Sequence, residues 1–377
     1  MKKLTTIIAV ITLLCAAPGC KKTPDVSSNV APDAVSNTVL QDQVQGGTVM
    51  ARHSNELDCD QVNLVSDIRG YHAKRTDPLL NNAWGIAFDE SGALWIACNH
   101  TGSAVIYDKN GERLRKPVAI PLGEDPNGAA PTGVVYNDTQ DFIIPANGQK
   151  SEFIFATEEG ILSAWSSGSS SITVADRSAT GAVYKGIALA NDRGANFLYV
   201  TNFSAGKIDV YDHSFHLVSK PFSDLTIPPG YAPFNIANIN GKLYVTYALQ
   251  KPDHHDDQSG PGNGYVNIFN PDGSFVRRFA SRGTLNSPWG ITQADEGFGL
   301  AANSILIGNF GDGRINVYDA SGAWRGQLQD KEHAIAIDGL WTIAFLPNDA
   351  KSGPSRLYFT AGPDEENHGL FGYLKKQ

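Results

Sequence analysis

The sequence predicts an all-β fold built from six repeated antiparallel sheets, and three observations support this prediction. In a chain of 377 residues, Gly (38 residues) and aromatic residues (10%) are plentiful, whereas only 18% of the residues are charged. A short motif recurs six times with small variations. It consists of an aromatic residue or Pro one or two positions before a Gly, followed by a run of alternating apolar residues. Gly-containing turns separate the alternating segments, which is typical of β-hairpins.

The third residue of this motif marks each repeat, and successive markers lie 48 to 55 residues apart: Gly85, Gly133, Gly186, Asn235, Gly290 and Thr342. A period near fifty residues, filled with strands and turns, is the length of one propeller blade. The sequence therefore predicts a six-bladed β-propeller with four antiparallel strands per blade.

The other strands of each blade follow in a fixed order. A second, apolar strand ends in a short polar residue, as in residues 198–202 and 305–309. A third strand begins after Gly and ends in Asp or Asn, as in residues 206–212 and 264–270. A turn and a more polar fourth strand complete the unit, as in residues 274–279.

The last repeat is one strand short, because residues 341–345, 356–360 and 369–374 supply only three strands. Residues 62–68 form a spare strand before the first repeat, so we expect them to complete the last blade and close the ring. This arrangement would place Cys59 and Cys98 at opposite faces of the propeller, too far apart for a disulfide.

The first twenty residues predict an export signal. Lys2 and Lys3 precede a nearly charge-free stretch that is too short to span a bilayer. The segment ends at Cys20 and resembles the bacterial lipoprotein signal, which implies acylation of Cys20; an ordinary secretory signal is the alternative. We therefore expect a lipoprotein signal peptide in residues 1–20, a flexible tether in residues 21–58 and the propeller in residues 59–377.

Charge and location restrict the partners. The formal net charge of −9 argues against nucleic acid, because phosphate binding needs a basic face. We expect a monomer that is anchored in the bacterial envelope through its lipid only. The outer membrane is favoured, because Lys21 rather than Asp follows Cys20.

The repeats resemble the NHL-type six-bladed propellers over residues 60–375. Four strings are also similar to an uncharacterised family of secreted bacterial propellers: residues 184–186, 254–264, 285–290 and 308–316. This resemblance implies the fold and leaves the activity open.

One face of a propeller carries the loops between second and third strands and the first residues of the blades. We expect Asn99, Lys185 and Asp338 to face the channel there. Six-bladed lactonases hold calcium at this channel mouth, and hard cations prefer oxygen ligands. The resemblance suggests a site for Ca²⁺ or another divalent cation formed by Glu158, Asn202, Asn235 and Asn309. Alternatively, these Asn residues only cap their own turns.

A second candidate cluster is the long loop that contains His254, His255, Asp256 and Asp257. Imidazoles beside carboxylates suit a transition metal such as zinc, although a solvated polar loop explains the same residues.

The sequence contains none of the usual hydrolase motifs, such as Gly-x-Ser-x-Gly or His-Glu-x-x-His. We therefore expect an envelope protein that binds a small molecule, a glycan or an envelope protein on its loop-rich face. The alternative is a calcium-dependent hydrolase, similar to lactonases or lyases.

Overall fold

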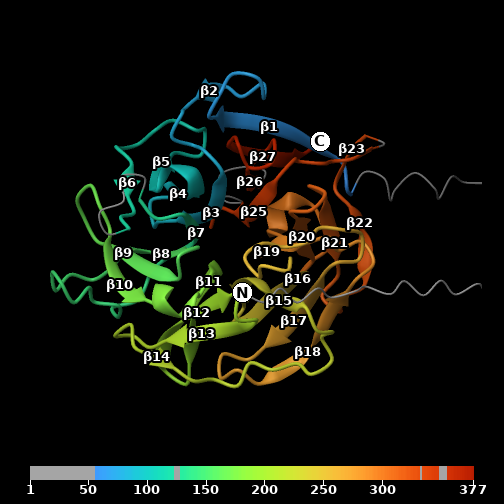
Figure 1. The fold of residues 1–377 in the computed structure, drawn as a ribbon. Helices are drawn as coiled ribbons and strands as arrows, with labels where there is room; N and C mark the ends of the chain where they lie inside the picture. The colour runs from blue at the N-terminus through green and yellow to red at the C-terminus, as the bar shows by residue number, and fades with distance from the viewer. Residues whose placement is uncertain (1–55, 123–127, 332, 348–354) are drawn as a thin grey trace, which may run out of the picture. The chain divides into compact units, whose positions relative to one another are not determined.

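A computed structural model describes residues 56–122, 128–331, 333–347 and 355–377. The expected signal peptide, Cys20 and nearly all of the expected tether lie outside these residues. The described segments belong to the compact unit Val49–Gln377, and it is a six-bladed propeller (Figure 1). The predicted fold class is therefore confirmed.

Each of the first three blades contains four consecutive antiparallel strands. In blade one these are β3 (Ala83–Phe88), β4 (Leu94–Cys98), β5 (Ser103–Tyr107) and β6 (Val118–Ala119). Blade two contains β7 (Pro131–Tyr136), β8 (Phe153–Thr157), β9 (Ile161–Trp165) and β10 (Ile172–Asp176). Blade three contains β11 (Tyr184–Asp192), β12 (Ala195–Asn202), β13 (Lys207–Tyr211) and β14 (Leu217–Val218).

Blades four and five repeat this plan. Blade four contains β15 (Tyr231–Ile239), β16 (Lys242–Leu249), β17 (Tyr265–Phe269) and β18 (Phe275–Ser281). Blade five contains β19 (Pro288–Gln293), β20 (Ile305–Asn309), β21 (Ile315–Tyr318) and β22 (Trp324–Gln327). A small hairpin that the sequence did not suggest, β23 (Gln329–Asp330) and β24 (His333–Ala334), follows blade five.

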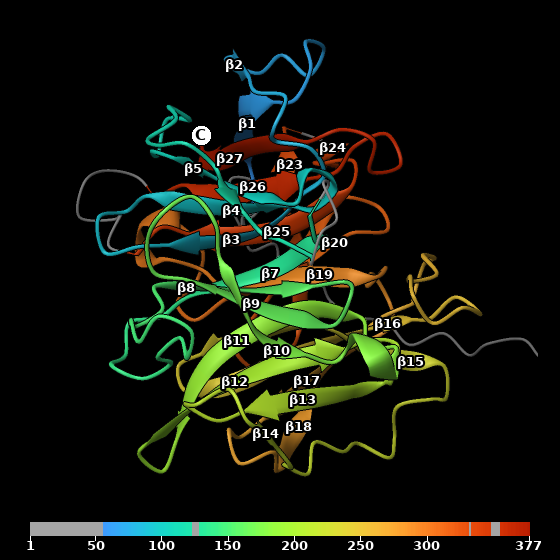
Figure 2. The same ribbon diagram turned by 60° about the vertical axis from the view of Figure 1, so that its left-hand side comes forward.

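The last blade joins the two ends of the propeller. It contains β25 (Leu340–Phe345), β26 (Leu357–Ala361) and β27 (Leu370–Lys376), and its outer strand is β1 (Cys59–Ser66). β1 runs antiparallel to β27 with Val62 opposite Tyr373. Figures 1 and 2 both show β1 next to β27. A two-residue strand, β2 (Arg75–Thr76), pairs in parallel with β1. The predicted closure by an N-terminal strand is confirmed.

The recurrent Gly has a steric cause. A Cβ atom at Gly85 would lie 2.6 Å from the carbonyl oxygen of Thr132, and one at Gly290 would lie 2.6 Å from that of Trp341. The inner strands of neighbouring blades thus approach too closely for a side chain at this position. Where the marker is not Gly, its side chain bonds to the next blade instead: Thr342 Oγ1 donates to the Trp84 carbonyl at 2.7 Å.

Apolar side chains fill the spaces between blades, and Leu64 and Val65 of β1 pack with blade-one residues such as Leu94. Cys59 and Cys98 are both fully buried and free, in agreement with the expected lack of a disulfide between them.

Candidate functional site

Aromatic side chains close the central channel. Trp84, Trp289 and Trp341 are almost completely buried and pack with Phe203 and Phe234. The Trp84 and Trp341 rings stack with their centroids 3.4 Å apart, and Trp289 meets both edge-on. Trp289 lines one cavity and Trp341 lines another, so this aromatic plug lies between the two.

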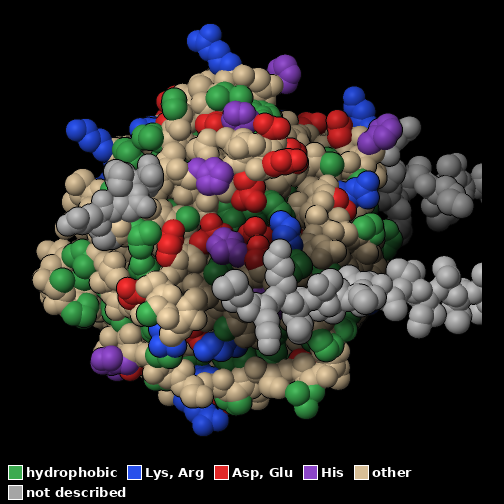
Figure 3. All heavy atoms as spheres, in the orientation of Figure 1, with side chains coloured by type: hydrophobic (Ala, Val, Ile, Leu, Met, Phe, Trp, Pro, Cys, Tyr) green, Lys and Arg blue, Asp and Glu red, His purple; other side chains and the backbone are tan. Residues whose placement is uncertain are grey.

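One cavity, about 450 Å³, lies on the side of the plug away from the first residues of the blades, and we call it the far cavity. It is lined mainly by the inner strands β3, β7, β11, β15, β19 and β25. The cavity on the other side, about 420 Å³, lies among the first residues of blades and the loops between second and third strands. We call it the mouth cavity; its lining includes Lys185, Lys251, Asp256, Phe310, Trp341 and Glu366. Figure 3 shows Asp, Glu and His side chains gathered with a basic side chain around the centre of one face.

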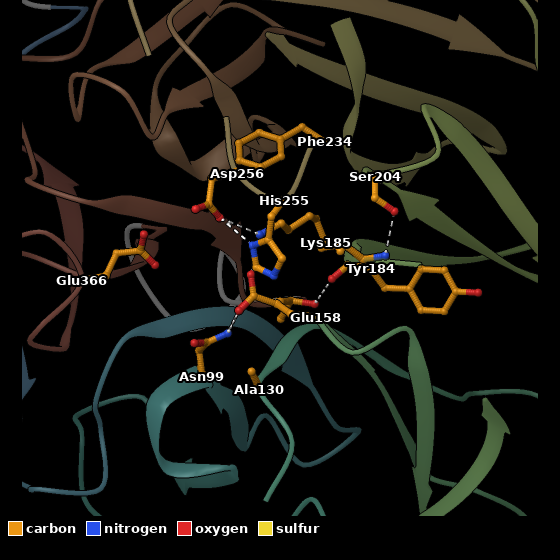
Figure 4. Close-up of polar contacts among 12 residues, drawn as sticks. Asn99, Ala130, Glu158, Tyr184, Lys185, Ser204, Phe234, His255, Asp256 and Glu366 are labelled. Atoms are coloured by element: carbon orange, nitrogen blue, oxygen red, sulfur yellow. Dashed lines mark hydrogen bonds and ion pairs between the residues drawn. The ribbon is translucent and has the colours of Figure 1, made fainter. Parts of the chain in front are cut away.

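A buried ion pair lies beside the mouth cavity. Lys185, at the start of β11, is only 2% exposed, and its Nζ contacts Glu158 Oε1 and lies 3.5 Å from Asp256 Oδ1. The ammonium also lies 5.2 Å from the Trp84 ring centroid. Asn99 Nδ2 donates to the other Glu158 oxygen at 3.0 Å (Figure 4). Lys185, Glu158 and Asn99 were all expected at the channel mouth, and the structure brings them together.

The contact between Lys185 and Glu158 shifts the pKa values of both side chains. Burial acts to raise the pKa of Glu158, but contact with Lys185 and the Asn99 bond lower it below its usual range. Burial acts to lower the pKa of Lys185, but Glu158 and Asp256 raise it. Both groups are therefore charged at neutral pH.

The long loop of blade four contributes a His–Asp pair. His255 Nδ1 lies 3.0 Å from Asp256 Oδ1, and this bond raises the pKa of His255 and lowers that of Asp256. Asp257 is buried and lines the mouth cavity, and burial raises its pKa. His254 is exposed with a positive φ of 60°. Three of the four predicted loop residues thus lie at the site.

Glu366 lies on the side of the mouth cavity opposite Lys185, and it was not predicted from the sequence. Its Oε2 accepts a 2.7 Å bond from Asn82 Nδ2, and Asn82 Oδ1 in turn accepts from Trp341 Nε1 at 3.1 Å. Burial, together with the nearby charges of Glu158 and Asp256, raises the pKa of Glu366 to about 7. The signal for Glu366 was the repeat register, because its loop joins the second and third strands of blade six.

Glu366 ends a rare backbone turn. Asp364, Glu365 and Glu366 have successive φ values of 57°, 53° and 68°. A left-handed conformation costs roughly 1–2 kcal/mol for each residue that is not Gly, and such strain is concentrated at functional sites. Asp338 Oδ2 holds the turn by accepting from the Asp364 backbone N–H at 2.8 Å. Asp338 lines the mouth cavity, near where the sequence placed it.

The three predicted Asn ligands bond elsewhere. Asn202 Nδ2 donates to Asp209, and Asn309 Nδ2 donates to the Thr284 carbonyl and to Asp312. Asn235 lines the far cavity and donates to the Trp289 carbonyl at 2.8 Å. These bonds engage the Nδ2 atoms of all three residues, and Asn235 lies at the far cavity. The cation site expected from the oxygens of Glu158, Asn202 and Asn309 stays a prediction.

Among the described residues, one group of His, Cys, Asp or Glu side chains has the spacing for a metal ion. The candidate ligand atoms of Glu158, His255 and Asp256 lie within 4.8 Å of one another. The Lys185 ammonium contacts both carboxylates, so it already supplies the positive charge that a cation would supply there.

Comparison with known proteins supports the fold and defines a family. No family model matches the sequence. The uncharacterised protein L690 of Acanthamoeba polyphaga mimivirus is 36% identical over 332 residues, which cover 84% of this chain and 86% of that protein. Protein R648 of the same virus is 36% identical over 331 residues, which cover 84% and 80%. Both relatives are viral, so they do not support the expected link to secreted bacterial propellers.

Solved propellers are similar in fold only. The soluble aldose sugar dehydrogenase of Escherichia coli matches with a TM-score of 0.53 at 13% identity, covering 85% of this chain and 100% of that chain. Streptogramin B lyase matches with a TM-score of 0.51 at 13% identity, covering 85% and 97%.

Proposed function

This chain belongs to one family with the uncharacterised mimivirus proteins L690 and R648, and we propose that it binds a small polar molecule in the mouth cavity. The observation that supports this most is the convergence of charged side chains from blades three, four and six on a cavity of about 420 Å³. That volume lies in the range of small-molecule sites, which combine an apolar surface with a few placed polar groups. Phe310, stacked on Trp341 at 4.0 Å, supplies the apolar surface.

The test fills the cavity. Ser259 is exposed and lines the mouth cavity, so Ser259→Trp places a large side chain inside it. The matched control is Ser281→Trp, at an exposed position of β18. Sugars, polyols, amines and carboxylic acids are screened by thermal shift and calorimetry against the full chain. We expect a compound whose binding is lost in Ser259→Trp and kept in Ser281→Trp; binding that survives in both variants contradicts the proposal.

A metal-assisted hydrolase is the second candidate, and the spacing of Glu158, His255 and Asp256 favours it. A bound divalent ion would polarise a carbonyl group of the substrate. Because Lys185 contacts two of the three side chains, the ion must compete with an ammonium. Metal analysis of the purified full chain tests this candidate, and a metal content that falls in His255→Ala supports it.

We also propose that the chain is exported and acylated at Cys20. This proposal depends on the sequence of residues 1–20 alone. No helix among the described residues is long and apolar enough to cross a membrane. Labelling with radioactive palmitate in a Gram-negative host should mark the full chain and leave Cys20→Ala unlabelled; equal labelling of both chains would refute acylation at this residue.

A further inference from the structure

The mouth cavity carries an excess of negative charge. Five carboxylate residues line it, against two Lys residues: Asp256, Asp257, Asp338, Glu365 and Glu366, with Lys185 and Lys251. Lys185 is already engaged by Glu158, which lies just outside this lining, and Lys251 is an exposed side chain 3.8 Å from Asp256. The cavity therefore attracts positive charge and repels anions.

Among the described residues, Asp256 is the one lining carboxylate that forms ion pairs, so Glu366 is one of four that have no cationic partner there. Its bond from Asn82 is neutral, and among the described residues no Lys, Arg or His forms an ion pair with it. The left-handed turn directs its carboxylate toward the Lys185–Asp256 side of the site (Figure 4). A strained and fixed acidic group that faces a cavity is well placed to bind a ligand.

The cavity is much larger than a metal ion and has an aromatic surface. The Phe310 ring is partly exposed, and it lies on Trp341 at an interplanar angle of 19°. An aromatic face beside carboxylates suits an organic cation, which gains from both ring and charge.

We propose that the mouth cavity binds an organic cation, a small molecule with an amine or guanidinium group, and that Glu366 is its counter-ion. This inference depends on the proposed small-molecule function and specifies its ligand class. The cationic group would lie against Glu366, and the apolar part of the ligand would lie on Phe310.

The proposal predicts that binding depends on pH. The pKa of Glu366 without ligand is about 7, so Glu366 is mostly neutral at pH 6 and mostly ionised at pH 8. A bound cation favours the ionised form, so affinity should rise about tenfold between these pH values and a proton should be released on binding. The charged or titratable groups around Glu366 are His100, Glu158, Lys185, Asp256, Asp338, Asp364, Glu365 and His368.

His255 must be separated from Glu366, because it is a second titratable group at the site, and its bond to Asp256 raises its pKa above the ordinary value of an imidazole. Protonated His255 would repel a cation and would change affinity in the same direction. The variant Glu366→Gln separates the two groups, because it removes one titration and leaves His255 unchanged. Its matched control is Glu296→Gln, an exposed Glu in the loop between β19 and β20.

The experiment is calorimetry of the full chain between pH 6 and 8, with phenethylamine, agmatine and spermidine as cationic probes. Phenylethanol and glucose are the neutral probes. We expect at least one cation to bind about tenfold more tightly at pH 8 than at pH 6, with proton release shown by buffers of different ionisation enthalpy. Glu366→Gln should bind it more weakly with little dependence on pH, whereas Glu296→Gln should behave like the parent.

The outcomes distinguish this inference from the proposed function. If neutral probes bind and Ser259→Trp abolishes their binding, while cations bind no better, the inference fails and the small-molecule function stands. If no compound from the wider screen binds in the cavity, both fail. Cation binding that Glu366→Gln leaves unchanged, or Ca²⁺ or Zn²⁺ binding that excludes every organic cation, also overturns the inference.

Discussion

Replacing Lys185 by Met should destabilise the propeller strongly. Lys185 is 2% exposed, and the Glu158 side chain is 16% exposed, so the pair lies away from water. Met has a similar length and keeps the packing against Trp84, but it leaves Glu158 as a buried carboxylate without its cation. Breaking a buried pair from one side costs about 3–5 kcal/mol. With an unfolding entropy of about 2.1 cal/mol/K per residue over roughly 330 residues, the melting temperature should fall by about 4–7 °C.

The pH dependence of this loss has a defined sign. In the parent chain the pKa of Glu158 is lowered, so the pair contributes stability above the ordinary pKa of Glu, and that stability is lost as the pH falls. In Lys185→Met, burial raises the pKa of Glu158 without the opposing effect of Lys185, and only the weaker effects of the Asn99 bond and His255 still lower it. The variant therefore gains relative stability when this carboxyl is protonated, and the difference between the two proteins should shrink toward pH 5.

The measurement is equilibrium unfolding in urea, with calorimetry for the melting temperature, at pH 7.5 and pH 5. The double variant Lys185→Met with Glu158→Gln should lose only about 0–2 kcal/mol, because no buried charge remains and Gln can still accept from Asn99. A single variant as stable as the parent at pH 7.5, or no recovery in the double variant, would refute this account of the pair.

Three further predictions concern closure, the tether and the metal candidates. Deleting residues 60–69 removes β1 and should lower the unfolding midpoint sharply in thermal scans, because the last blade loses its outer strand. Deleting residues 21–55 should leave the melting temperature unchanged, since the sequence has no periodic apolar pattern there. If a divalent ion binds near His255, Ca²⁺ or Zn²⁺ should raise the melting temperature in thermal-shift assays, and His255→Ala should abolish the rise.

Each of these predictions has an outcome that would contradict it. A chain without residues 60–69 that melts like the parent would mean that β1 does not hold the ring closed. A loss of several degrees on removal of residues 21–55 would mean that this segment packs on the propeller. Metal-free protein whose melting temperature responds to neither ion would remove the metal-assisted hydrolase as a candidate function.

The sequence alone determined the fold, because each repeat consists of strand and turn patterns that can be recognised from neighbouring residues. The period of 48 to 55 residues set six blades, and the missing strand after residue 374 predicted β1 in the last blade. The register also placed Asn99, Glu158, Lys185 and Asp338 at one mouth. Loops between second and third strands meet at one face of a propeller, so counting strands was sufficient for these residues.

The directions in which the side chains at the mouth point could be seen only in the tertiary structure. Asn235 lines the far cavity and its Nδ2 donates to the Trp289 carbonyl of the next blade, whereas Lys185, one position earlier in the repeat, lines the mouth cavity. Glu366 enters the site through a left-handed turn that residue preferences disfavour. Its protonation near pH 7 depends on burial and on Glu158 and Asp256, which are distant in sequence. These features arise from contacts between blades, so they cannot be predicted from the pattern of residues within one repeat.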